Sequence, residues 1–208
     1  MYKESVGFAG ETSEASIIEK QAQKEKGAFG YPRGDLKMKK LENFVKSDAG
    51  KLALYASGAL TMLFEGVETF VLIPKVQKEA DGKMIFDLSF MNSQEKMQEF
   101  LDALSDKGAD LYLNTLLKTD NVFPLIYSTF FALFLTKFNG KADWKTALPY
   151  LMLCFDYTEN FCSTKMLKSG EVSKSMALFA NTMTKGKMLT MTTILNLMAL
   201  AWWNSRKD

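Results

Sequence analysis

Histidine is absent from the 208-residue sequence. Its absence removes the commonest general base, the commonest metal ligand and the usual haem ligand. Only two cysteines are present, Cys154 and Cys162, and their spacing matches neither a zinc site nor a redox pair. We therefore expect no metal site and no thiol chemistry, and we expect both cysteines to serve as small apolar residues.

The N-terminal region lacks the features of a targeting segment. Residues 1–12 are too polar for the apolar core of a secretory signal. Glu4, Glu11, Glu14 and Glu19 are unlike a transit peptide, which contains few acidic residues. We therefore expect any insertion into a membrane to depend on the internal apolar segments.

Apolar residues are strongly segregated along the chain, although the average composition is ordinary, with 47% hydrophobic residues and a net charge of +2. Residues 1–51 are mostly polar, and the apolar residues gather in later stretches. About 20 residues suffice for a helix to cross a bilayer core. Two segments, 52–74 and 176–203, exceed that length, and two others, 122–138 and 147–163, lie near the lower limit of about 17 residues.

A soluble helical bundle is the alternative interpretation of these segments. Its helices should carry a polar stripe every three or four residues, yet only hydroxyls interrupt 122–135. Trp144, Trp202 and Trp203 lie at segment ends, where membrane proteins place an aromatic belt. We therefore predict an all-α, four-span integral membrane bundle over residues 52–208, preceded by a polar extramembrane arm over residues 1–51.

An amphipathic helix is predicted between the first two spans. Met97, Phe100, Leu101 and Leu104 recur at helical spacing in an otherwise polar stretch. We expect this helix to lie at the membrane surface or against a partner.

Costly polar groups occur in every predicted span. Asp156, Glu159 and Asn160 follow an i, i+3, i+4 spacing, which puts all three on one helix face. Charged groups at membrane depth need partners. We predict an intramembrane polar cluster with these members: Glu65, Glu68, Asp120, Asp156, Glu159, Asn160, Lys185 and Lys187.

Three roles for this cluster remain open. The groups could lock helix to helix through hydrogen bonds, each contributing about 1 kcal/mol. They could form a proton or ion path, or a site for a polar headgroup. Paired carboxylates also perform acid–base chemistry, but no nucleophile motif, metal triad or phosphate-binding loop accompanies them. We favour the helix-locking role and predict no catalytic residue.

Three short motifs resemble a known family. They are Glu68 to Pro74, Asp120 to Tyr127 with its Phe-Pro-Leu-x-Tyr run, and Asp156 to Asn160 with its Asp-x-x-Glu-Asn pattern. Together they resemble an uncharacterised family of small four-helix integral membrane proteins that is widespread in bacteria. The resemblance covers about residues 52–203 and implies four spans, with a lysine early in the fourth helix that Lys185 or Lys187 would match. It implies no activity, and the polar arm departs from the compact bacterial pattern.

We expect a non-catalytic accessory subunit of a large membrane-embedded energy-converting complex of the respiratory-chain kind, in the mitochondrial inner membrane. The thylakoid and the bacterial inner membrane are alternative locations. The expected partners are membrane lipids and other subunits, which the chain would contact through the arm and the lipid-facing helices. We expect no binding of nucleic acid, because the sequence has no basic stripe interleaved with exposed aromatic residues. No cofactor is expected, although a bound lipid is compatible with the cluster and a carboxylate can ligate the magnesium of a pigment. A stand-alone membrane enzyme or transporter that handles a lipid or a proton through the acids is the competing function.

Overall fold

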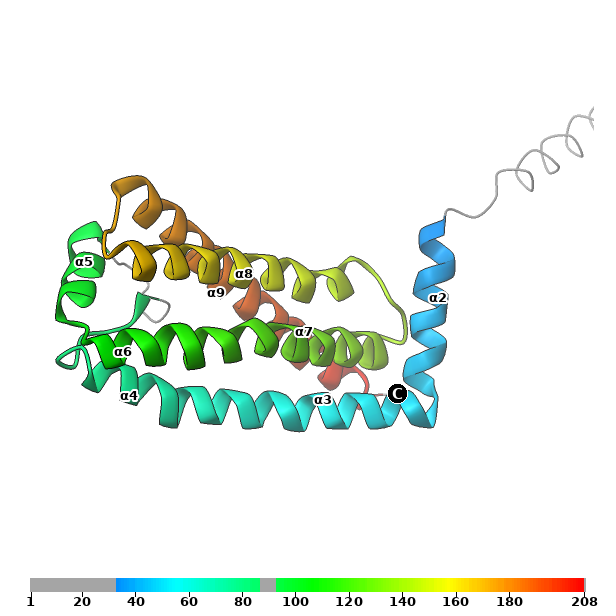
Figure 1. Cartoon of the computed structure of the whole chain (residues 1–208). Coiled ribbons are helices and arrows are strands. Elements are labelled where there is room, and N and C mark those ends of the chain that lie inside the picture. Colours follow the sequence, from blue (N-terminus) through cyan, green and yellow to red (C-terminus); the bar gives the residue numbers. More distant parts are fainter. Residues whose placement is uncertain (1–32, 87–92, 208) are drawn as a thin grey trace, which may run out of the picture. The chain divides into compact units, whose positions relative to one another are not determined.

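The computed structural model describes residues 33–86 and 93–207, and all regular elements in these ranges are helical. The predicted all-α fold is therefore confirmed for the described part of the chain. The chain divides into two units, Met1–Lys37 and Met38–Asp208, and the second contains the helical bundle (Figure 1). Residues 1–32 of the predicted arm lie outside the described residues.

Two long helical runs each contain one π-helical turn. In the first run, α3 and α4 are joined through η1: α3 (Asp48–Val67), η1 (Glu68–Leu72) and α4 (Ile73–Lys78). In the second run, α6 and α7 are joined through η3: α6 (Asp106–Leu111), η3 (Tyr112–Leu116) and α7 (Leu117–Asn139). Each π turn is an irregularity in an otherwise α-helical run, a feature common near functional sites.

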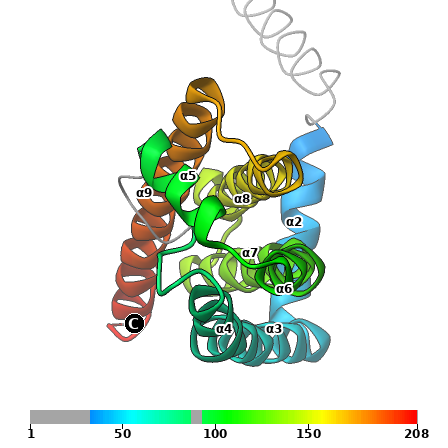
Figure 2. The same cartoon turned by 60° about the vertical axis from the view of Figure 1, so that its left-hand side comes forward.

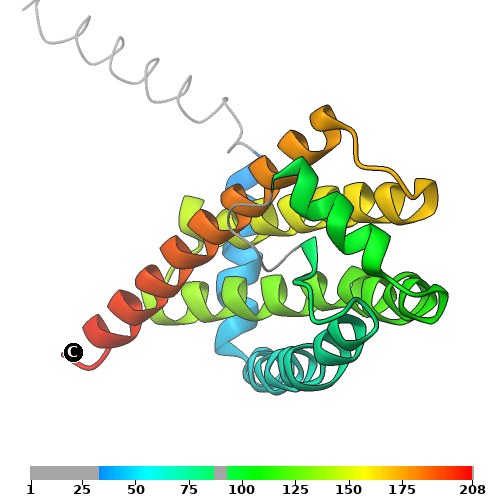
Figure 3. The same ribbon diagram turned by 90° about the vertical axis from the view of Figure 1, so that its left-hand side faces the viewer.

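Helix α7 is the central element of the bundle. It packs against α3, against α8 (Trp144–Ser169) and against α9 (Lys174–Asn204), while α8 and α9 also pack on each other. Figures 1 and 2 show α3 and α8 on either side of α7, and Figure 3 shows α9 crossing the bundle obliquely. This arrangement leaves α3 and α9 separated across one face of α7.

The helix ends follow local capping chemistry. The Ser47 and Ser173 hydroxyls accept hydrogen bonds from backbone N–H groups in the first turns of α3 and α9. Asp143 and Thr146 form a reciprocal capping box at the start of α8. Gly140 and Gly170 end α7 and α8 with φ near +70°, a conformation that favours glycine.

Two helices are long and apolar enough to cross a membrane: Asp48–Lys78 and Asp106–Asn139. They correspond to the predicted spans 52–74 and 122–138. The predicted spans 147–163 and 176–203 lie in α8 and α9, which are long enough but do not meet the same test of apolarity. Their polar residues, including the Asp156 to Asn160 group, lower the mean hydropathy of these helices.

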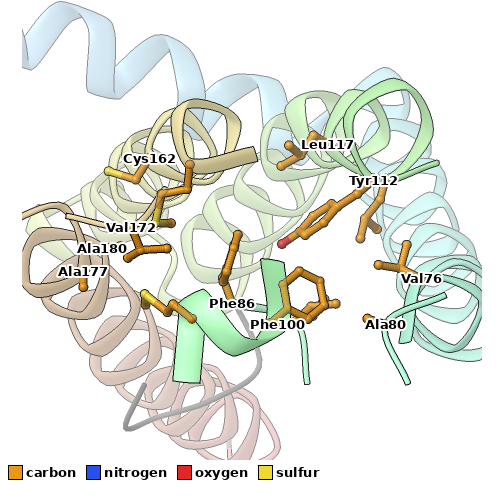
Figure 4. Packing of buried hydrophobic residues seen from close by; sticks show 14 of the residues in the cluster. Val76, Ala80, Phe86, Phe100, Tyr112, Leu117, Cys162, Val172, Ala177 and Ala180 are labelled. Atoms are coloured by element: carbon orange, nitrogen blue, oxygen red, sulfur yellow. The ribbon is translucent and has the colours of Figure 1, made fainter. Parts of the chain in front are cut away.

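The predicted amphipathic helix forms as α5 (Gln94–Ala103), but its expected position is wrong. Met97 and Phe100 are buried in a core cluster of this same chain, so the apolar face is not available to a membrane or a partner. In Figure 4, Phe100, Phe86 and Tyr112 face one another at the centre of that cluster. Gln98 also holds the loop between α8 and α9, because its side chain accepts from the Val172 N–H at 2.8 Å.

The bundle unit begins before the predicted boundary at residues 51/52. Helix α2 (Arg33–Lys46) precedes α3, and its Val45 packs in a small cluster with Leu54 of α3 and Leu133 of α7. The Glu42 carboxylate accepts a hydrogen bond from the Ala142 N–H at 2.9 Å. The residues from Met38 onwards therefore belong to the same compact unit as the long helices.

Candidate functional site

A buried lysine and two buried carboxylates form the centre of the site. The Lys187 ammonium lies 2.9 Å from an Asp156 carboxylate oxygen and also pairs with Glu159. The two acids, on α8, are almost fully buried, and the α9 lysine is largely buried. The ion pairs therefore join the two helices in a region with little water.

Helical spacing on α8 and on α9 explains which side chains meet at this centre. Asp156 and Glu159 are three apart on α8, so they face the same side. On α9, Thr184 precedes Lys187 by three residues, and its hydroxyl donates to Glu159. Glu159 thus receives a hydroxyl and an ammonium from one face of α9, which satisfies both of its oxygens.

Asn160 has a different role, which depends on a proline in the neighbouring helix. Pro124 of α7 has no N–H, so the Asp120 carbonyl four residues earlier loses its helical donor. The Asn160 side-chain amide donates to that carbonyl at 3.0 Å. The Tyr157 hydroxyl donates to the adjacent Asn121 carbonyl, also at 3.0 Å. Helix α8 therefore supplies hydrogen bonds where proline interrupts the bonding pattern of α7.

Three other predicted members of the cluster, Asp120, Glu68 and Glu65, lie near the Lys187 centre. Asp120 is close enough to Lys187 and Glu159 to interact with both electrostatically. Glu68, buried in η1, and Glu65, exposed on α3 and hydrogen-bonded to the Thr69 hydroxyl at 3.1 Å, lie on the same side of the bundle as the Lys187 centre, along a shared cavity.

Lys185 is not part of this site. It is exposed, and within the described residues no ion pair involves it. Two residues correspond to about 200° of rotation on a helix, so Lys185 and Lys187 point in nearly opposite directions. Placing Lys185 in the cluster is therefore wrong.

A cavity of about 480 Å³ lies between α3 and α9, with α7 as its floor. Glu65, Glu68, Asp120 and Asp156 line it, together with Lys187. Lys187 is the basic residue of this lining; it pairs with Asp156 and Glu159 and also interacts electrostatically with Asp120. The cavity is therefore rich in acidic groups.

The apolar part of the cavity wall includes aromatic and sulfur-containing side chains. Phe123, Tyr127 and Phe131 follow one face of α7, with ring centroids 5.2 and 5.7 Å apart in sequence order. Met152, Met188 and Met191 contribute from α8 and α9. Tyr127 is 94% buried, and among the described residues its hydroxyl has no hydrogen-bond partner. A buried hydroxyl without a protein partner in a cavity wall is a donor available to a ligand.

Three features of the site were not predicted from the sequence: Thr184, Tyr127 and the link between Asn160 and the carbonyl near Pro124. Two of these had a signal: Thr184 shares a helix face with Lys187, and Asp120 stands four residues before a helical proline. Tyr127 had none, because its place depends on how far apart α3 and α9 lie. In the described ranges, no group of three potential ligands is positioned to hold a metal ion.

A comparison of the chain with protein-family models, curated proteins and solved structures found no match. The resemblance of its three motifs to the bacterial four-helix family therefore stays a prediction.

Proposed function

We propose that this chain is an integral membrane protein that serves as a non-catalytic accessory subunit of a larger membrane complex. The observation that carries the proposal is the exposure of α3. Only 11% of the apolar window in Asp48–Lys78 is buried within the chain, against 50% in Asp106–Asn139. A helix this apolar and this exposed needs lipid or another protein around it.

The exposed side chains of α3 are large. Leu52 is 69% exposed, Met62 is 75% exposed, and Phe70 in the adjoining π turn is 80% exposed. The other long helices also present large apolar side chains outwards, among them Leu125, Phe161 and Leu189. The charged cluster of Asp156, Glu159 and Lys187, in contrast, lies inside the bundle. Large exposed apolar side chains fit a bilayer and would promote aggregation in water.

In this proposal the Lys187 centre locks α8 to α9, and four helices span the membrane. Intramembrane hydrogen bonds of this kind contribute about 1 kcal/mol each. The open face of α3 and the polar N-terminal region would contact other subunits. We place the complex in an energy-converting membrane, the mitochondrial inner membrane first, on the grounds given by the sequence.

Native gel migration in mild detergent tests the subunit role. The full-length chain, extracted from its own membrane, should migrate in a band much larger than the single chain. A chain that lacks residues 1–35 should insert into the membrane but leave that band. If the full-length chain migrates as a monomer or dimer, the subunit role is wrong.

The cavity favours a second candidate function. A helix-locking cluster needs no space around it, yet an acid-lined cavity of about 480 Å³ adjoins the Lys187 centre. Pockets that hold small ligands have similar volumes. A stand-alone membrane protein that binds a lipid or other amphiphile through this cavity is the alternative, and it predicts migration as a monomer or dimer in the same gel.

A further inference from the structure

We propose that one end of the bundle binds the headgroups of anionic lipids. This surface, the basic end, consists of residues 38–51, 137–145 and 204–207, which form the α2–α3 joint, the α7–α8 turn and the end of α9. The inference rests on the proposed location in a bilayer and names the lipid that lies against this end. Three features carry it: an excess of positive charge, acids that are engaged within the chain, and exposed indole rings.

Three segments that are far apart in the sequence meet at the basic end. Val45 of α2 packs in one cluster with Leu133 of α7, so the α2–α3 joint lies beside the end of α7. Ile194 of α9 packs in another cluster with Met152 of α8, so the last turns of α9 run towards the start of α8. Figure 1 shows the C-terminus at the same end of the bundle as the start of α3. The charges of these segments therefore form one surface.

Positive charge predominates at the basic end. Its three segments contain nine basic and three acidic residues, a net charge of +6. The basic residues are Lys39, Lys40, Lys46, Lys51, Lys137, Lys141, Lys145, Arg206 and Lys207. At the opposite end, residues 75–86, 93–118 and 165–174 contain nine basic and eight acidic residues, a net charge of +1. The two ends thus differ in net charge, although they have the same number of basic residues.

The three acids of the basic end are engaged within the chain. Asp48 pairs with Lys51 at 2.9 Å, and Asp143 caps the start of α8. The Glu42 carboxylate accepts from the Ala142 N–H at 2.9 Å. Most of the basic side chains at this end are exposed. The phosphate groups of anionic lipids would supply the complementary negative charge, since clusters of lysine and arginine beside a span attract such lipids.

Exposed indole rings lie at this end and place it at the depth of the headgroups. Trp144 is 65% exposed, and Trp202 and Trp203 are 42% and 58% exposed. The Arg206 guanidinium carbon lies 4.2 Å from the centroid of the Trp202 ring. Tryptophan is typical of the boundary between hydrocarbon and headgroups, where basic side chains also reach outwards. The exposed apolar surface of α3 begins at Leu52, directly after the basic segment, so the acyl chains of the same lipids would cover it.

Lipid retention measured by native mass spectrometry tests the proposal. The full-length protein in a neutral detergent is mixed with equal amounts of phosphatidylglycerol and phosphatidylcholine that have identical acyl chains. We expect at least about fivefold more phosphatidylglycerol to be retained, because each basic group near the headgroups attracts the anionic lipid. The preference should weaken as the ammonium acetate concentration rises from about 0.05 M to about 0.5 M, because salt screens exposed charges. Equal retention of the two lipids would overturn the proposal and would mean that this end meets water or an acidic protein surface instead.

Variants of the basic end locate the surface. Lys40→Gln with Lys46→Gln and Lys141→Gln removes three positive charges from exposed positions. We expect this triple variant to lower the preference for phosphatidylglycerol at least about threefold. Arg206→Gln with Lys207→Gln changes a different segment of the same surface and should lower the preference even if the triple variant folds poorly. An unchanged preference in both variants would contradict the proposal.

A matched triple variant at the opposite end serves as the control. Lys75→Gln with Lys96→Gln and Lys168→Gln also removes three positive charges from exposed positions and should leave the preference unchanged. Equal loss in the two triple variants would show an effect of overall net charge and would contradict a localised surface. Extraction with alkaline carbonate reports separately on the bilayer: a chain that stays in the membrane pellet but does not prefer phosphatidylglycerol would keep the proposed location and lose only this inference.

Discussion

Lys187 is the residue on which the buried site depends. It serves two carboxylates at once, Asp156 at 2.9 Å and Glu159. A buried ion pair gains little net stability over an apolar pair, because removing the charges from water is costly. Removing one partner is different, since the remaining charges then stay buried and uncompensated.

Replacement of Lys187 should therefore destabilise the protein strongly. Lys187→Met keeps the length of the side chain and leaves two acids without their cation, so we expect a loss of about 3–5 kcal/mol in the free energy of unfolding. Lys185→Met removes the same charge from an exposed position two residues away and should change stability by less than about 0.5 kcal/mol. Thermal unfolding in detergent, followed by circular dichroism, measures both. Similar melting temperatures for the two variants would contradict the assignment.

Glu79, outside the predicted spans, gives the protein a pH-dependent contact. Its carboxylate accepts from Lys107 at 2.9 Å and from the Ser105 hydroxyl at 2.7 Å. The Lys107 hydrogen bond first, and then that of Ser105, lower the pKa of Glu79 below its usual value of 4.5. A pKa that is lower in the folded state than in the unfolded state contributes stability at neutral pH, and that stability is lost as pH falls below the unfolded value.

Glu79→Gln should accordingly flatten the acid side of the stability profile. We expect the melting temperature of the parent to fall faster than that of the variant as pH is lowered from about 5 to about 3. Glu99→Gln, which removes a more exposed acid paired with Lys83 at 3.4 Å, serves as the control and should follow the parent. Parallel profiles for all three proteins would show that the contact has no effect.

Among the glycines that the structure describes, Gly50, at the joint between α2 and α3, leaves the least room for a side chain. A Cβ on Gly50 would lie 2.0 Å from the Phe44 carbonyl oxygen and 2.7 Å from the Val45 Cα. Both are backbone atoms, so the chain itself would have to move. Gly66, also in α3, has nothing within 4 Å of the same position.

The two glycines should respond in opposite directions to alanine. Gly50→Ala should cost about 1–3 kcal/mol by overpacking the joint, whereas Gly66→Ala should gain up to about 1 kcal/mol from helix propensity. Unfolding in detergent measures both free energies. A stabilised Gly50→Ala variant would mean that α2 does not pack against α3 as described.

Most of the helices and their ends could be predicted from the sequence, because helical periodicity and capping are local properties. The Asp156 to Asn160 face and the turn at Gly140 follow from spacing and glycine alone. The choice between Lys185 and Lys187 could not be predicted, since it depends on the rotation of α9 against α8. The cavity could not either, because it arises from the distance between two helices that share a third. For the two π turns we have no physical account.

The whole bundle leaves large apolar side chains exposed and buries a charged cluster beside its apolar core, and this combination supports the proposed location in a bilayer. Met62 and Phe70 face outwards and are mostly exposed, while Asp156 and Glu159 lie almost fully buried. Two helices have the length and apolarity of a span. The amphipathic helix α5 shows the limit of pattern analysis at this scale, because its apolar face covers the end of its own bundle.

Extraction of cell membranes with alkaline carbonate tests the central claim, that this bundle is embedded in a bilayer, most directly. The full-length chain, expressed in cells, should stay in the membrane pellet after this treatment and enter the supernatant only with detergent. A chain that is released by carbonate and remains monodisperse without detergent would contradict the claim.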